Sequence, residues 1–371
     1  MRNHFLFLAG LALIVFSCNN DTTSNVDEQG SGASQGFIDT RPSAKGAPGE
    51  VFVVIDPAQW EDSLGKEIRR TFAISVPGLP QPEPMFTLRN VSPLDMTKTL
   101  REMKSLVYVA TLDNDSRAGK RLNRNFTEAS MEEIRNDPDK FQFIKTDEFA
   151  KGQKVVHLFG ADEESLIQNI IDHREQLRNY FTKLEKDRLA ATLLDVTETG
   201  IDTRLRNNYG CSLKLPRGYE IAQPEDDFIW IRRLDATLDV DRAIFIYREP
   251  YTDESVFTEE GLQALRDRIT SKYIHDIQKP DIIMERQKEL FLSKEVNFHG
   301  NYAMEVRGLW RLNDLSLGGP YISYAMVDQS TNQLYYIEGY VAAPGTEKRT
   351  YMMEMEVILD TFRLVKQNTT N

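Results

Sequence analysis

Apolar and polar residues follow two periods along the first part of the chain, and these periods predict alternating strands and helices. Continuous apolar runs predict buried strands at 50–55, 106–112 and 154–159. A helical stripe, with one apolar residue every four positions, consists of Trp60, Leu64, Ile68 and Phe72. Asp56 and Pro57 precede this stripe as an N-cap and a first-turn proline, and Ser92 and Pro93 predict a second helix start of the same kind. A short charged helix is expected at 127–136.

A long helical stretch begins after Asp162, which is expected to cap it. Helical character continues, with a break near 197–200, as far as Tyr209, and Gly210 is suited to the position after the helix. We place the boundary between two halves of related size within this stretch. The predicted halves are 49–190 and 191–366.

The second half is rich in predicted strands. They are expected at 211–215, 228–234, 243–249, 302–312, 321–328 and 334–341, with a hairpin loop at 328–332. Helices are expected at 259–275 and 347–362. Long antiparallel strands with covering helices predict an α+β fold, with mixed and antiparallel sheets covered by helices.

The N-terminal segment has the pattern of a lipoprotein signal peptide. An apolar run of about a dozen residues is too short to span a bilayer, which takes roughly 20, and it ends in Val15-Phe16-Ser17-Cys18. We therefore expect cleavage after residue 17 and a diacylglyceryl thioether on Cys18, which would hold the protein to a membrane. Residues 18–48 are polar and predict a flexible tether. The alternative is an ordinary secreted protein whose signal peptide ends near Cys18.

The net charge limits which partners the protein can bind, and the cysteine content limits which disulfides it can form. The formal net charge of −12 disfavours nucleic acid through long-range repulsion. The chain has two cysteines, and lipidation of Cys18 would leave Cys211 without a partner for an intramolecular disulfide. Because Cys211 opens an apolar run, we expect a buried structural thiol rather than a nucleophile.

The candidate chemistry points to binding rather than catalysis. The histidines show no metal-ligand spacing, and the chain lacks nucleophile and phosphate-loop motifs, so no metal site and no cofactor are predicted. Strand alternation places Trp310 in the core and two arginines on the other face. The predicted face for an envelope partner or an anionic or sugar-like ligand consists of Arg307, Arg311, Tyr336, Glu338 and Arg349. The alternative for these residues is a salt-bridged layer beneath a covering helix.

Four segments carry a resemblance to a known family. They are PGEVFVVID from residue 48, PGLPQPEPMF from residue 77, RGLWRLNDLSLGGPYISYAMVD from residue 307 and EGYVAAPGTEKRTYMMEMEVIL from residue 338. Together they resemble an uncharacterised family of Bacteroidota envelope lipoproteins with a domain of unknown function. The resemblance implies a Gram-negative cell envelope, and in that setting Asp21-Thr22-Thr23 is similar to an O-glycosylation site at Thr22. The second half is also similar in element order to a PsbP-like α/β/α sandwich.

Two functions follow from these observations. The leading hypothesis is a lipid-anchored protein of the cell envelope with a binding or assembly role, held in a membrane that we expect to be the outer membrane. Whether it faces the periplasm or the cell surface stays open. The alternative is an envelope hydrolase that acts on glycan or peptide, with a site assembled from distant segments, for which His157 and His299 are the first candidates.

Overall fold

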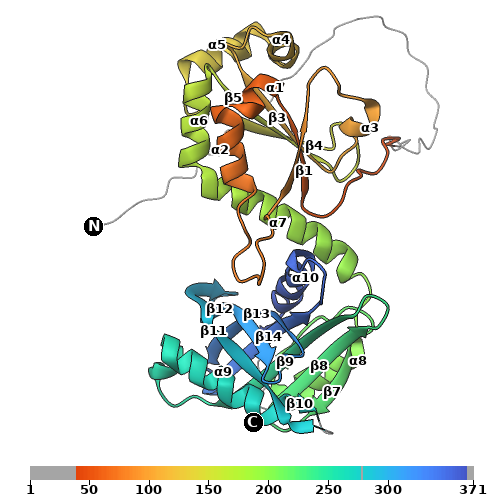
Figure 1. Ribbon diagram of the computed structural model, residues 1–371, viewed down its shortest axis with the longest axis vertical. Coiled ribbons are helices and arrows are strands. Elements are labelled where there is room, and N and C mark those ends of the chain that lie inside the picture. The colour runs from red at the N-terminus through yellow and green to blue at the C-terminus, as the bar shows by residue number, and fades with distance from the viewer. Residues whose placement is uncertain (1–38, 277–278, 366–371) are drawn as a thin grey trace, which may run out of the picture. The chain divides into compact units, whose positions relative to one another are not determined.

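The computed structural model describes residues 39–276 and 279–365, and the first half is built on a five-stranded sheet of order β2-β1-β3-β5-β4 (Figure 1). Neighbouring strands are parallel except β4, which is antiparallel to β5. The strands are β1 (Glu50–Val54), β2 (Thr87–Val91), β3 (Ser105–Thr111), β4 (Gln142–Thr146) and β5 (Lys154–Gly160). The predicted strands of this half are therefore present.

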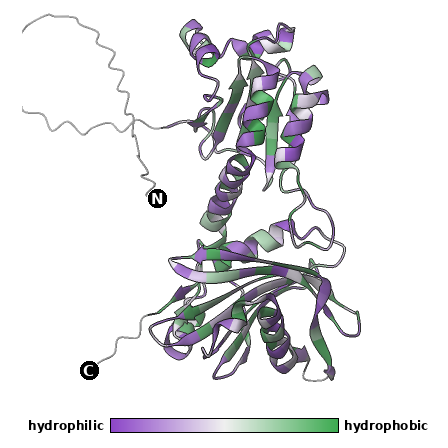
Figure 2. Cartoon of the chain, turned by 90° about the vertical axis from the view of Figure 1, so that its left-hand side faces the viewer, coloured by the Kyte–Doolittle hydropathy of each residue, from purple (hydrophilic) through white to green (hydrophobic). Residues whose placement is uncertain are grey.

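Helices cover this sheet unevenly. They are α1 (Pro57–Glu61), α2 (Ser63–Phe72), α3 (Lys98–Arg101), α4 (Arg117–Asn123), α5 (Glu128–Asn136), α6 (Glu163–Asp172) and α7 (Arg174–Leu193). The main core of this half joins apolar residues of α2, α6 and α7 to those of β1, β3 and β5. A much smaller cluster, to which α4 contributes Leu122, lies on the other face of the sheet. Figure 2 shows the apolar residues gathered on the strands and on one side of the helices.

Several helix boundaries in this half differ from the prediction. The stripe from Trp60 to Phe72 is buried as expected, but a break at Asp62 divides it between α1 and α2. The helix expected at Ser92 is wrong: the Ser92 hydroxyl accepts a hydrogen bond from Leu94 N–H in a turn, and α3 starts only after Thr97. The long stretch after Asp162 breaks at His173 between α6 and α7, and α7 continues to Leu193, beyond the boundary that we placed at residue 190.

The second half contains an antiparallel eight-stranded sheet of order β10-β11-β12-β13-β14-β9-β8-β7. The strands are β7 (Glu220–Pro224), β8 (Phe228–Asp235), β9 (Val240–Pro250), β10 (His275–Asp276), β11 (Lys279–Phe298), β12 (Asn301–Leu312), β13 (Gly318–Asp328) and β14 (Gln333–Ala342). A two-stranded sheet pairs β6 (Cys211–Ser212) with β15 (Arg363–Leu364).

Helices pack on both faces of the large sheet. The helical segments of this half are α8 (Thr199–Arg204), the π-helix η1 (Leu205–Tyr209), the 3-10 helix η2 (Glu254–Phe257), α9 (Glu259–Tyr273) and α10 (Arg349–Leu359). One core joins α10 to residues such as Ile337, and a second core joins α9 to residues such as Tyr336 on the other face. The α+β class is therefore confirmed, and the second half has the three layers of an α/β/α sandwich.

Local signals explain the ends of these elements. Thr258 caps α9 by accepting a hydrogen bond from Gly261 N–H, and Gly210 ends η1 with a φ of 67°, both as predicted. The strand expected at 211–215 pairs only over 211–212. Of residues 213–215, only Lys214 is exposed. Strand β11 is absent from the prediction, because its pairing with β12 shifts between Arg286 and Phe291 and interrupts the alternation of side chains.

Candidate functional site

The predicted ligand face is divided between the two sides of the eight-stranded sheet. Directly paired residues of neighbouring strands share a face, and the register pairs Arg307 with Ile322 and Ile322 with Gly339. Gly339 lies against Met355 of α10, so Arg307 is on the α10 side. Glu338 is the neighbour of Gly339 in the same strand and points to the α9 side. The prediction of one shared face is therefore wrong, because the register between strands cannot be seen in a single sequence.

Glu338 forms a buried ion pair with Arg266 of α9. The guanidinium donates two hydrogen bonds to the carboxylate, at 2.7 and 2.8 Å, and the two side chains are 1% and 0% exposed. Tyr336 donates a third hydrogen bond to the same carboxylate at 2.8 Å. Burial raises the pKa of Glu338, and the guanidinium opposes this rise. Arg266 is absent from the predicted set, although its position four residues after Leu262 places it on the buried face of the helix.

Arg307 belongs to a salt-bridged layer beneath α10. Its guanidinium bonds Glu356 at 2.6 Å and Glu305 at 2.9 Å, and Lys186 pairs with the same Glu356. Burial tends to raise the pKa of Glu356, but Arg307 and Lys186 prevail and lower it to about 2. The alternative that we gave for this face, a salt-bridged layer under a helix, describes the contacts of Arg307.

The remaining two arginines of the predicted face lie apart from these groups. Arg311 is 46% exposed, and its guanidinium is 3.9 Å from Glu285 on β11. Arg349 at the start of α10 donates from Nη1 to the carbonyl oxygens of Pro84 and Met85, at 2.7 and 3.3 Å. In the segment PGLPQPEPMF, the buried Glu83 carboxylate accepts hydrogen bonds from Lys348 N–H and Arg349 N–H.

A cavity of about 750 Å³ lies on the α9 side of the large sheet and is lined by aromatic residues from three strands. We call it the aromatic pocket and define it by Trp230 (β8), Trp310 (β12), Tyr340 (β14), Arg232 (β8) and Asp241 (β9). Its size falls within the range of small-molecule sites, roughly 300–1,000 Å³. Apolar residues from β11 and from the segment after α9 complete the lining, among them Met284 and Ile274.

The polar groups of the aromatic pocket are held by neighbouring side chains in fixed protonation states. Arg232 bonds Asp241, and its guanidinium carbon lies 4.8 Å from the centre of the Trp230 ring. Burial acts to lower the pKa of Arg232, but the bond to Asp241 holds it above its usual value. Burial and the nearby Asp241 raise the pKa of Tyr340 well above 10, so its hydroxyl keeps its proton. The Trp310 indole is 2% exposed, and its N–H has no acceptor among the described residues.

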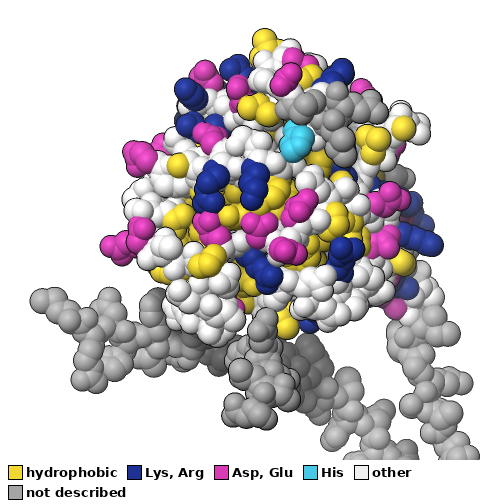
Figure 3. All heavy atoms as spheres, turned by 90° about the horizontal axis from the view of Figure 1, so that it is seen from below, with side chains coloured by type: hydrophobic (Ala, Val, Ile, Leu, Met, Phe, Trp, Pro, Cys, Tyr) yellow, Lys and Arg dark blue, Asp and Glu magenta, His cyan; other side chains and the backbone are white. Residues whose placement is uncertain are grey.

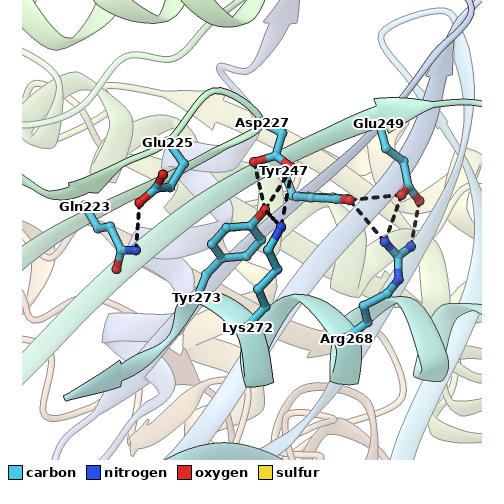
Figure 4. Close-up of polar contacts among 8 residues, drawn as sticks. All are labelled: Gln223, Glu225, Asp227, Tyr247, Glu249, Arg268, Lys272 and Tyr273. Atoms are coloured by element: carbon cyan, nitrogen blue, oxygen red, sulfur yellow. Dashed lines mark hydrogen bonds and ion pairs between the residues drawn. The ribbon is translucent and has the colours of Figure 1, made fainter. Parts of the chain in front are cut away.

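Polar contacts fix α9 against the sheet (Figure 4). The Tyr273 hydroxyl donates to Asp227 at 2.8 Å, and Arg268 pairs with Glu249 at 2.7 Å. Figure 3 shows the molecule from below, with basic and acidic side chains interspersed among apolar ones. These contacts with Asp227 and Glu249 fix the position of α9 on the sheet. The segment that follows α9 and lines the aromatic pocket therefore begins at a fixed position.

The other candidates from the sequence lie outside these sites. Cys18 and Thr22 fall outside the described residues. Cys211 is fully buried, and burial raises the pKa of its thiol to about 12. His299 lies in the turn after β11, with Nε2 3.3 Å from Asp360. Within 39–276 and 279–365, no group of three His, Cys, Asp or Glu side chains could hold a metal ion. No helix in this part of the chain is both long and apolar enough to cross a membrane.

The comparisons with known proteins give a domain of unknown function for each half. Residues 44–193 match one family model, Domain of unknown function (DUF8532), and residues 198–361 match another, Domain of unknown function (DUF4837). Both halves match uncharacterised families. No curated protein matches the chain. A domain of unknown function is thus confirmed for the chain, while the assignment to Bacteroidota lipoproteins stays a prediction.

Solved structures with a partial likeness include a yeast, a bacterial and a human protein. The Ran-binding protein Mog1p of Saccharomyces cerevisiae is 12% identical, over 43% of this chain and 93% of that chain, with a TM-score of 0.29. LpqN of Mycobacterium tuberculosis, described as involved in cell envelope biogenesis, is 11% identical over 42% and 83%, with a TM-score of 0.26. Human StAR-related lipid transfer protein 5 is 9% identical over 47% and 92%, with a TM-score of 0.22. These scores support no conclusion about function.

Proposed function

We propose that this chain is a lipid-anchored protein of a Gram-negative cell envelope that binds a sugar-like ligand in the aromatic pocket. The observation that carries the ligand class is the lining of the pocket, where the rings of Trp230, Trp310 and Tyr340 lie beside the Arg232–Asp241 pair. The apolar faces of a sugar ring would pack on the aromatic rings, and its hydroxyl groups would bond to the charged pair.

The charged groups of the aromatic pocket favour binding over catalysis. Asp241 is engaged by Arg232, and Tyr340 keeps its proton, so these groups offer hydrogen bonds in one protonation state. A planar guanidinium that is held by a carboxylate still presents further N–H donors to a ligand. The hydrolase alternative would instead require turnover of a glycan or peptide that occupies the pocket.

The ligand proposal is tested on a glycan array with the purified full-length protein. We expect binding to defined saccharides and loss of at least tenfold in affinity in Trp230→Ala, since half-buried Trp230 forms one wall of the pocket. Leu234→Ala is the matched control, because Leu234 lies on the same strand, is 66% exposed and does not line the pocket. Absence of binding across the array, or equal binding by wild type and Trp230→Ala, would contradict the proposal.

The anchor proposal rests on the sequence around Cys18 and is tested separately. In cells supplied with radiolabelled palmitate, the wild-type chain should incorporate label and sediment with membranes. The Cys18→Ala variant should stay unlabelled and keep its signal peptide. Cys211→Ala is the control and should be labelled normally, because its thiol is buried in the second half. A labelled or normally processed Cys18→Ala variant would refute lipidation at this residue.

A further inference from the structure

In the described part of the first half, α2, α6 and α7 pack into one core on one face of the sheet. The other face carries the small cluster to which α4 contributes. Beside the small cluster to which α4 contributes, three rings from neighbouring strands stack in a row. His157 of β5 lies between Tyr108 of β3 and Phe143 of β4, with ring centres 5.1 and 4.2 Å away. These rings form an aromatic floor.

Four cations surround a cavity of about 370 Å³ above this floor. We call it the cationic pocket and define it by Arg101, Arg121, Arg124, Lys145 and His157. Lys145 pairs with Glu148 at 2.9 Å. In the described part of the chain, no carboxylate lies within 4 Å of the three arginine guanidinium groups. Because the three arginines have no carboxylate partner, the cavity carries a net positive charge, although the chain as a whole has a formal net charge of −12.

The buried imidazole at the base of this pocket is also without a partner. His157 is 5% exposed, and its Nε2 has no hydrogen-bond partner among the described residues. Glu148 Oε2 lies 4.0 Å away and has none either. Burial, with a contribution from Lys145, lowers the pKa of His157 to about 4, so the imidazole is neutral at pH 7. A group that both donates and accepts, such as a hydroxyl, could satisfy both atoms.

We propose that the cationic pocket binds the phosphate group of a small hydroxylated phosphomonoester. A phosphomonoester carries a charge of −1.5 to −2 at pH 7, and guanidinium groups bond such oxygens in bidentate fashion. The unpaired Arg101, Arg121 and Arg124 supply the charge, and the polar atoms of Glu148 and His157 meet a hydroxyl of the ligand. Both a soluble sugar phosphate and a lipid headgroup carry this chemistry.

The experiment measures binding by calorimetry with three probes: inorganic phosphate, glycerol 3-phosphate, and vesicles of phosphatidylcholine with 10% phosphatidic acid. We expect saturable binding of glycerol 3-phosphate that is tighter than binding of phosphate and that weakens as salt is raised. Binding of the vesicles but not of glycerol 3-phosphate would instead identify the lipid headgroup as the source of the phosphate. In either case the ¹³C-labelled His157 ring should shift on binding.

A double variant with a charge-matched control tests the residues. Arg121→Gln/Arg124→Gln should weaken binding at least tenfold, and both side chains are exposed, so the fold should be retained. Arg117→Gln/Arg135→Gln removes the same charge from exposed positions of α4 and α5 outside the pocket and should change affinity less than twofold. Absence of saturable binding to all three probes, or an equal loss in both double variants, would overturn the proposal. The saccharide proposal concerns the other half and would be unaffected.

Discussion

The buried ion pair between Arg266 and Glu338 gives the sharpest prediction for stability. Replacing Arg266 by Met removes the guanidinium and leaves a carboxylate that is 0% exposed without its cation. Breaking a buried pair from one side costs about 3–5 kcal/mol. We therefore expect Arg266→Met to lower the free energy of unfolding by about 4 kcal/mol, with the loss confined to the second half.

The matched control lies two residues further along the same helix. Arg268 pairs with Glu249, but the Arg268 side chain is 53% exposed, and exposed pairs contribute about 0.2–1 kcal/mol. Arg268→Met should therefore cost less than about 1 kcal/mol. Both variants are compared by urea unfolding in a Trp60→Phe background, so that the fluorescence comes from Trp230 and Trp310 in the second half.

A double variant separates the pair's attraction from the penalty of an unpaired charge. Replacing both partners by apolar residues is often nearly neutral, so Arg266→Met/Glu338→Leu should recover at least half of the loss. Should Arg266→Met unfold within about 1 kcal/mol of wild type, or no earlier than Arg268→Met, the assignment of a desolvated ion pair would be refuted.

Two further predictions use the shifted pKa values. His157 has a pKa of about 4 in the folded chain and about 6.5 when unfolded, so the unfolded chain takes up a proton first as the pH falls. The free energy of unfolding should therefore decrease by up to ~3 kcal/mol between pH 6.5 and pH 4. In thermal unfolding curves measured across this range, His157→Gln should reduce the dependence of stability on pH. An unchanged dependence would argue against burial of the neutral ring. Burial raises the pKa of the Cys211 thiol to about 12. In a Cys18→Ala chain, this thiol should therefore react with iodoacetamide at least a hundredfold more slowly in the folded protein than in urea. Similar rates in the two conditions would contradict its burial.

Much of the fold follows from local patterns that a single sequence contains. Apolar alternation is enough to predict β12, β13 and β14, and the Thr258 cap is enough to start α9. Strand β11 escapes prediction, because its shift in register falls in a charged stretch where alternation fails. The helix expected at Ser92 fails for a different reason: a serine followed by proline starts a turn as readily as a helix.

The candidate sites could not be predicted in the same way, because they depend on which strands are neighbours. Alternation within β12 and β14 is visible, but the register that places Arg307 and Glu338 on opposite faces is set by pairing through β13. The aromatic pocket joins Trp230 to Trp310, which are far apart in sequence. Among these residues, Arg266 alone could have been identified from the sequence. It is a charged residue at an inward position of a helix, and such a residue implies a buried partner of opposite charge.

The most direct measurement of ligand binding uses the indole N–H signals of the three tryptophans in a ¹⁵N-labelled protein. Trp230 and Trp310 line the aromatic pocket, while Trp60 lies in α1 of the first half and is an internal control. On titration with the saccharide selected on the array, the account predicts that the Trp230 and Trp310 signals move, because the ligand packs on both rings, and that the Trp60 signal stays in place. A Trp310 signal that does not move at saturation would contradict the account.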